Sequence, residues 1–63
     1  MKARDRVRVI DELEAQDGFS FIGMTGTVTK SFEDGVIITI DKEFFTGTAL
    51  NDLFFEYAEL EKI

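Results

Sequence analysis

Hydrophobic and polar residues alternate with a period of two in several short stretches of the chain, a pattern typical of half-buried β-strands. In the first stretch, residues 5–10, Val7 and Val9 fall on one face of the expected strand. Arg6 and Arg8 fall on the opposite face. The valines are therefore expected in the core, and the arginines on the surface.

Two further stretches, residues 22–32 and 36–40, are expected to pair as a β-hairpin. The Asp34-Gly35 dipeptide between them is a strong hairpin signal, because both residues adopt positive φ at low cost. Gly26 lies inside the earlier stretch and indicates a bulge, a sharp bend or a close approach of backbone. In the later stretch the residues expected to face inward are Val36, Ile38 and Ile40.

The rest of the chain adds loops and two closing strands to this pattern. Residues 11–21 are expected to form an acidic loop, and residues 46–52 a turn-rich connection. Residues 53–63 predict a strand, a short 3₁₀ turn and a final short strand. The whole chain, residues 1–63, is therefore expected to be a single all-β domain, a small SH3-like barrel of five strands.

The composition excludes several classes of chemistry. The chain has no cysteine and no histidine, so no disulfide, no thiolate metal site and no imidazole base is available. No acidic run has the spacing of a calcium-binding loop, and neither a catalytic pair nor a cofactor motif can be named. We therefore expect no enzyme activity, no metal and no cofactor.

Charge is unevenly distributed along the chain, whose net charge is −6. Four basic residues and one acid in the first eight residues give that segment +3, so the remaining 55 residues carry −9. A mostly acidic surface disfavours direct nucleic-acid binding and favours a protein partner with a basic surface. No apolar run is long enough to cross a membrane and no signal peptide is recognised, so a cytoplasmic protein is expected.

The order of these features resembles one family of SH3-like barrels. The segments that carry the resemblance are RVRVI, GMTGTV, VIITID and the ending FFEYAELEKI. They are similar to subunit IV of the photosystem I reaction centre (PsaE), and also to the ferredoxin-facing subunit of the photosynthetic NDH complex and the β-chain barrel of nitrile hydratase. The resemblance covers residues 6–63 and implies the barrel fold.

Individual positions match the photosystem subunit. The matching residues are Val7, Val9, Gly26, Thr27, Val28, Phe45, Thr46, Gly47, Phe55, Glu59 and Leu60. The resemblance implies an accessory subunit of an electron-transfer complex, which presents a positively charged face to ferredoxin. At the family's basic position late in the third strand, this chain has Thr39.

A basic stripe formed by Arg4, Arg6 and Arg8 is one candidate binding surface, for an acidic partner, a phosphate or an RNA backbone. In an SH3-like barrel the first and last strands lie side by side, which would place Glu59 and Glu61 opposite the arginines. We favour this structural role, because opposite-charge cross-strand pairs contribute roughly 0.2–1 kcal/mol each.

Aromatic side chains provide the main functional hypothesis. SH3-like domains commonly bind peptides in a groove lined by exposed aromatic residues near the first long loop. The residues that could line such a groove are Phe19, Phe21, Phe54 and Tyr57, and the loop acids that could select basic ligand residues are Glu12, Glu14 and Asp17. Core packing is the competing role for each aromatic residue.

The two phenylalanine doublets differ in how clearly the pattern orients them. Counting from an inward Phe55 places Phe54 on the outer face. For the other doublet, strand parity places Phe44 inside, whereas the family match favours Phe45. Phe54 is therefore the aromatic residue whose exposure most needs an explanation.

Three functions remain open at this stage. The leading hypothesis is a non-catalytic protein-binding module, either a small accessory subunit or a stand-alone adaptor. The second is an accessory subunit of a photosynthetic electron-transfer complex that helps to dock a soluble carrier. The third is an acidic inhibitor from a phage or mobile element that imitates nucleic acid. The sequence identifies neither the partner nor the oligomeric state.

Overall fold

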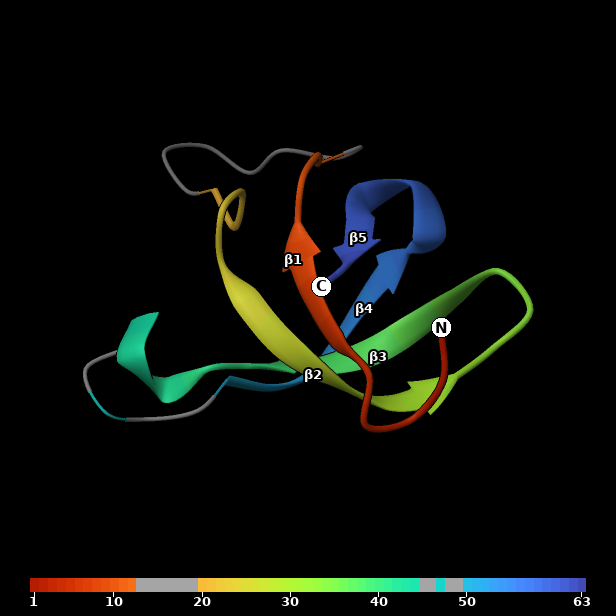
Figure 1. Cartoon of the computed structure of the whole chain (residues 1–63), viewed down its shortest axis with the longest axis horizontal. Coiled ribbons are helices and arrows are strands. Elements are labelled where there is room, and N and C mark those ends of the chain that lie inside the picture. Colours follow the sequence, from red (N-terminus) through yellow and green to blue (C-terminus); the bar gives the residue numbers. More distant parts are fainter. Residues whose placement is uncertain (13–19, 45–46, 48–49) are drawn as a thin grey trace.

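The chain folds into one antiparallel β-sheet of five strands (Figure 1). The computed structural model describes residues 1–12, 20–44, 47 and 50–63. Its strands are β1 (Arg6–Val9), β2 (Thr25–Ser31), β3 (Gly35–Ile40), β4 (Leu50–Glu56) and β5 (Leu60–Lys62). The 3₁₀ turns η1 (Lys42–Phe44) and η2 (Tyr57–Glu59) are the only helical elements in the described ranges, where no helix is long and apolar enough to span a membrane.

The strand order across the sheet is β4-β3-β2-β1-β5, and every pairing is antiparallel. The last strand returns to lie beside the first, as expected from the sequence. The predicted all-β architecture and the 3₁₀ turn before the last strand are both confirmed. Among the described strands no pairing joins the two edge strands, β4 and β5, so the sheet is open.

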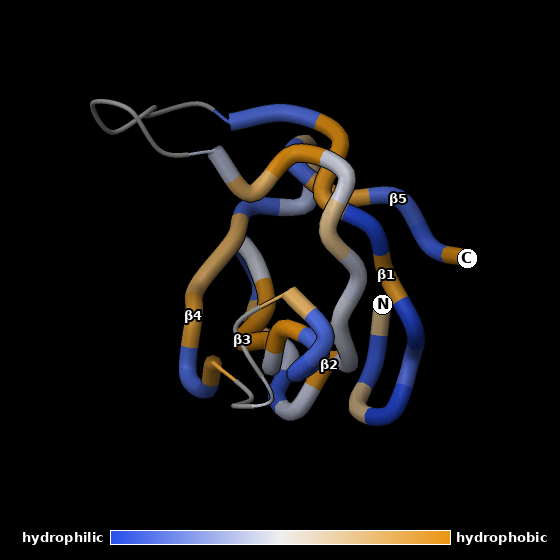
Figure 2. The backbone as a smooth tube through the Cα atoms, turned by 90° about the vertical axis from the view of Figure 1, so that its left-hand side faces the viewer, coloured by the Kyte–Doolittle hydropathy of each residue, from blue (hydrophilic) through white to orange (hydrophobic). Residues whose placement is uncertain are grey.

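One face of the sheet forms the hydrophobic core. The buried residues are Val7, Val9, Val28, Val36, Ile38, Ile40, Phe55 and Leu60. They include every inward residue predicted for the first and third strands, because one buried face of a strand enforces a period of two. Figure 2 shows this alternation along β1, whereas the middle of β4 is continuously hydrophobic.

Gly26 allows two strands to approach each other closely. It is buried in β2, where it pairs with Val7 of β1 on one side and Ile40 of β3 on the other. A Cβ atom on this residue would lie 2.5 Å from the backbone oxygen of Thr39, too close for any side chain. Of the three roles that the sequence left open for Gly26, the structure shows the close approach of backbone.

Two register shifts interrupt the ladders of the sheet. The first lies between Val28 and Lys30 of β2, opposite β3. The second lies between Ile38 and Ile40 of β3, where the facing segment of β4 is one residue longer and Asp52 has a positive φ of 60°. Such bulges bend a strand and increase its twist, which favours a strongly curved sheet.

The turn between β2 and β3 forms at the predicted place but not with the predicted backbone. Neither Asp34 nor Gly35 has a positive φ. The turn is closed by the Phe32 N–H, which donates to the Gly35 carbonyl at 2.8 Å. A Cβ atom on Gly35 would overlap the carbonyl oxygen of Phe55 on β4. Glycine is therefore needed here for close packing of strands, and not for a left-handed turn.

The end of β3 decides whether Phe44, the first residue of the Phe44-Phe45 doublet, faces the core. The strand stops at Ile40, and η1 begins at Lys42, so strand parity does not extend to Phe44. Phe44 is 37% exposed, and the inward placement that parity predicted is wrong. Phe45 lies outside the described residues.

Candidate functional site

Three apolar side chains, Phe32, Ile37 and Phe54, lie around Gly35 on the outer side of β3, β4 and the adjoining turn, and we call them the outer patch. Ile37 and Phe54 are direct cross-strand neighbours. The Phe54 ring extends over Gly35, since two ring carbons lie 2.5 and 2.9 Å from where a Cβ atom of residue 35 would be. Phe32 adjoins Gly35 through the backbone hydrogen bond of the turn.

The outer patch is open to solvent. Phe54 is 48% exposed, Phe32 is 42% exposed, and Ile37 is half-buried. The Lys30 ammonium group lies 5.3 Å from the centre of the Phe32 ring, a cation–π distance, so a cation borders the patch. Single exposed apolar residues are ordinary on protein surfaces, whereas a contiguous apolar group is a candidate contact surface.

The outer patch has a simple origin in the sequence. The strands β3 and β4 contain the apolar runs VII and LFF, which do not alternate with polar residues. Because neighbouring residues of a strand face opposite sides, one apolar residue of each run must face outward. These residues are Ile37 and Phe54, and the expectation that Phe54 is the outward aromatic residue is confirmed.

The residues predicted to line an aromatic groove divide between the two sides of the sheet. Phe21 packs against the core, with its ring 5.7 Å from that of Phe55 and at 89° to it. Tyr57 is half-buried and also packs against the core. Phe54 points the other way, because it directly precedes the buried Phe55 in β4. Phe21 and Phe54 therefore do not share a surface.

The predicted acidic loop is described only at its beginning. Glu12 is half-buried, and its carboxylate accepts a hydrogen bond from the backbone N–H of Phe21. This bond holds the start of the loop against the segment that leads into β2. The other predicted groove residues, Glu14, Asp17 and Phe19, lie outside the described residues.

Tyr57 supports the turn that carries Phe32. Its hydroxyl group donates a hydrogen bond to the Phe32 carbonyl and lies 3.1 Å from the Ser31 hydroxyl. The Ser31 hydroxyl in turn donates to the Met1 carbonyl at 2.9 Å. Tyr57 thus connects η2 and the start of the chain to one end of the outer patch.

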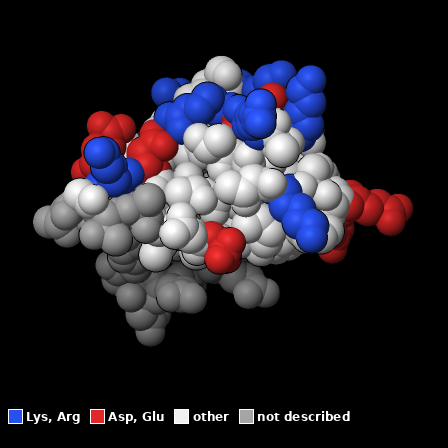
Figure 3. All heavy atoms as spheres, turned by 90° about the horizontal axis from the view of Figure 1, so that it is seen from below, with Lys and Arg blue, Asp and Glu red and all other residues white. Residues whose placement is uncertain are grey.

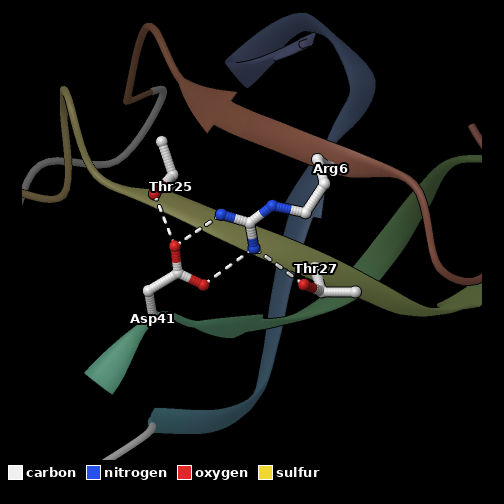
Figure 4. A network of polar contacts seen from close by, with 4 residues as sticks. All are labelled: Arg6, Thr25, Thr27 and Asp41. Atoms are coloured by element: carbon white, nitrogen blue, oxygen red, sulfur yellow. Dashed lines mark hydrogen bonds and ion pairs between the residues drawn. The ribbon is translucent and has the colours of Figure 1, made fainter. Parts of the chain in front are cut away.

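The arginine stripe is largely engaged in ion pairs within the sheet. Arg6 donates two hydrogen bonds to Asp41, at 2.8 and 2.6 Å, and a third to the Thr27 hydroxyl at 2.8 Å (Figure 4). The Thr25 hydroxyl donates to the same carboxylate at 2.7 Å. The bonds from Arg6 are the main cause that lowers the pKa of Asp41 to about 2; burial opposes the shift, and Thr25 assists it.

The other two arginines differ from Arg6. Arg8 pairs with Glu61 of β5 at 3.2 Å, which confirms one of the two predicted cross-strand partners. The other predicted partner, Glu59, accepts a hydrogen bond from the Glu56 N–H within the capping box of η2. Arg4 is exposed, has a positive φ of 77° and forms no ion pair with a described residue.

The remaining charged groups of the described residues form one further ion pair and no cluster of metal ligands. Within these ranges no group of three acidic side chains could hold a metal ion. A third ion pair joins Lys62 to Asp5 at 3.7 Å, so β1 and β5 carry cations that are already matched by carboxylates. Figure 3 shows several Lys and Arg side chains along one edge of the face in view and others toward its ends, with acidic groups at both ends and near the middle of this face.

Two residues of this region were not predicted from the sequence: Asp41, which binds Arg6, and Phe32, which belongs to the outer patch. Asp41 follows the inward Ile40, so strand parity could have placed it on the same face as Arg6. Phe32 lies two residues after Lys30, and the cation–π contact between them places both on one side of β2. For both residues, strand alternation predicts which side of the sheet the side chain occupies, but it does not predict which residue the side chain contacts.

No protein-family model matches this chain, and neither a curated protein nor a solved structure matches it. Function therefore has to be inferred from the residues and their placement.

Proposed function

We propose that the chain is a non-catalytic protein-binding module that contacts its partner through the outer patch. The observation that carries the proposal is that Phe54, in the middle of a strand, is 48% exposed beside the apolar Ile37. Aromatic residues are enriched in protein interfaces, because they bury a large area and lose little conformational entropy on binding.

We further propose that the sheet is that of an SH3-like barrel. Three features support this fold: the antiparallel order β4-β3-β2-β1-β5, the pairing of the first strand with the last, and the 3₁₀ turn η2 between β4 and β5. Gly26 and the two bulges supply the bending that such a barrel requires. Small barrels of this kind serve mainly as scaffolds for binding surfaces, which agrees with a binding role.

The charge distribution favours a partner with a basic surface. The three described ion pairs use the carboxylates of Asp5, Asp41 and Glu61. The exposed carboxylates that form no ion pair among the described residues are Asp11, Glu33, Asp34, Glu43, Asp52 and Glu56. With a net charge of −6, the molecule attracts basic partners and repels acidic ones.

The alternative functions have less support from the described residues. Docking of an acidic electron carrier needs an available basic face, but Arg6 and Arg8 are paired and the third-strand position holds Thr39. Imitation of nucleic acid needs carboxylates along one face at phosphate spacing, whereas the cations and the three ion pairs on β1 and β5 interrupt the acidic surface. Neither alternative explains an exposed phenylalanine at the middle of β4.

Site-specific photocrosslinking tests the proposal. A benzophenone-bearing phenylalanine analogue is introduced at position 54, and the protein is irradiated in a lysate of its source cells. The proposal predicts one specific crosslinked protein, which excess unmodified chain displaces. The matched control carries the same analogue at position 44, because Phe44 is also exposed but lies in η1, away from the outer patch. Identical products from both positions, or none from position 54, would overturn the proposal.

A further inference from the structure

One edge of β4 has no hydrogen-bonding neighbour among the described residues. The strand pairs with β3 on one side only, and it stands at the end of the strand order. Apart from the β3 ladder, no described residue forms a hydrogen bond with the backbone of residues 50–55. Unpaired strand edges are templates for the addition of another strand.

The side chains of β4 are exclusively acidic, polar or apolar. The strand reads LNDLFFE, and the exposed carboxylates of Asp52 and Glu56 stand two residues before and two residues after Phe54. No basic residue lies in the strand to balance them. A strand that docks here would therefore lie beside the Phe54 ring, and the carboxylates of Asp52 and Glu56 would flank it on either side of that ring.

Charge argues against a second copy of the chain as the docked strand. If two β4 strands met antiparallel with Phe54 at the twofold axis, the bulge that carries Asp52 in each copy would lie near Glu56 of the other. A shift of one step in either direction, which keeps the same faces together, would place Phe54 opposite one of these carboxylates. Like charges directly opposite, and a desolvated carboxylate against a ring, both destabilise a sheet.

We infer that the partner binds by adding an extended segment of basic–x–apolar–x–basic character to the free edge of β4. This inference rests on the proposed binding role of the outer patch, of which Phe54 is the member that lies on β4. The apolar residue of the segment would contact Phe54, and its lysine or arginine residues would face Asp52 and Glu56. Main-chain hydrogen bonds give affinity in this binding mode, and the alternate side chains give selectivity.

Both ends of β4 limit the length of the added strand. Asp52 has a left-handed backbone at the bulge, so the regular edge begins at Leu53. At the other end the Glu56 N–H already donates to the Glu59 carboxylate at 2.8 Å. The main-chain pairing is therefore short and centred on Phe54, and only the basic side chains of the docked segment extend to Asp52 and Glu56.

Nuclear magnetic resonance with defined peptides tests the inference on the full chain. The probe is the acetylated and amidated peptide Lys-Thr-Ile-Thr-Lys, titrated into ¹⁵N-labelled protein at low salt. The Phe55 carbonyl faces Gly35 of β3, so the neighbouring Phe54 turns its N–H and C=O groups toward the free edge. We expect the amide resonance of Phe54 to shift and saturate, and its hydrogen exchange to slow. The control peptide Glu-Thr-Ile-Thr-Glu should leave this resonance unchanged.

Backbone methylation of the peptide distinguishes strand addition from simple side-chain contact. Alternate N–H groups of an added strand face its neighbour, so N-methylation at isoleucine and N-methylation at both threonines must differ in effect. One of the two methylated peptides should bind and the other should not. Equal binding of both would overturn strand addition.

A charge-neutral variant tests the selectivity without disturbing the strand. The double substitution Asp52→Asn and Glu56→Gln keeps a residue that tolerates the left-handed backbone and keeps an amide in the capping box. We expect the basic peptide to bind at least about fivefold more weakly and with less dependence on salt. Unchanged affinity would contradict the assigned role of the two carboxylates.

The experiments distinguish failure of the strand-addition inference from failure of the proposed binding function. Shifts at Phe32 and Ile37 without shifts in β4 would reject strand addition and leave the outer patch as a contact surface. An absence of any shift at millimolar peptide would reject the inference, while crosslinking from position 54 would decide the binding function separately. Shifts in β4 that follow protein concentration without peptide would identify a second copy as the occupant and overturn the inference.

Discussion

Arg6 of β1 reaches across β2 and holds Asp41, at the end of β3, through two parallel hydrogen bonds of 2.8 and 2.6 Å. The Asp41 side chain is 24% exposed and that of Arg6 is 44% exposed. Such a bidentate contact fixes the relative orientation of the two side chains better than a single charge pair does. It connects three neighbouring strands on the side of the sheet that faces away from the core.

Asp41→Asn should lower the free energy of unfolding by about 1 kcal/mol at neutral pH, because partial exposure of the pair weakens its contribution. The folded-state pKa of Asp41 is lowered from the usual 3.8 to about 2. Its stabilisation is therefore complete above pH 3.8 and is lost as the pH falls toward 2. Urea unfolding of both proteins at several pH values between 2 and 5 should show the difference shrinking over that window.

The pair between Arg8 and Glu61 is the matched comparison for this effect. It has one contact of 3.2 Å, and both side chains are nearly half exposed. A double-mutant cycle should give a coupling energy of a few tenths of a kcal/mol for this pair, clearly below that of Arg6 and Asp41. Equal coupling energies would show that the bidentate geometry has no special importance.

Gly35→Ala should destabilise the protein by about 2 kcal/mol, because the new methyl group meets both the Phe55 carbonyl oxygen and the Phe54 ring. Adding Phe54→Ala removes the ring but leaves the backbone oxygen in place. The double variant should therefore recover only a small part of the loss. Full recovery in a thermal or urea unfolding experiment would show that the ring is the only obstacle.

The two neighbouring phenylalanines of β4 should respond differently to truncation. Phe55 is 5% exposed, so Phe55→Ala should cost about 3–5 kcal/mol and can prevent folding. Phe54 is 48% exposed on the outer face, beside Gly35 and Ile37, so Phe54→Ala should cost less than about 1 kcal/mol. Circular dichroism and urea unfolding measure both values, and a large cost at Phe54 would assign it to folding.

Tyr57→Phe should cost about 1 kcal/mol, because the variant loses the hydrogen bond to the Phe32 carbonyl. The ring remains packed against the core, so the fold is retained. Hydrogen exchange at the Phe32 amide, which closes the turn to Gly35, should become faster than in the parent protein. Unchanged exchange there would indicate that Tyr57 does not hold the turn.

Much of the fold could be predicted because local alternation is decided by burial on one face. The inward placement of Val7, Val9 and Ile38, and the outward placement of Phe54, follow from a period of two. At Gly26 the sequence predicted a special backbone position but not which kind, and the structure shows a close approach of strands.

The long-range contacts could not be predicted in this way. The partner of Arg6 is 35 residues distant in sequence, and the contact depends on how the intervening strand is twisted. The division of Phe21 and Phe54 between two faces also follows from the path of the chain before β2, which periodicity does not describe. Candidate surfaces are therefore harder to predict than strands, because they combine residues from several elements.

The most direct measurement of the central claim is the affinity of the partner captured at position 54 for variants of the outer patch. Isothermal calorimetry would compare the parent chain with Phe54→Thr, which keeps a strand-forming residue, and with the control Phe44→Thr. The binding-module account predicts about tenfold weaker binding for Phe54→Thr, corresponding to about 1.4 kcal/mol, and unchanged binding for Phe44→Thr. Parent-like affinity of a folded Phe54→Thr variant would contradict it.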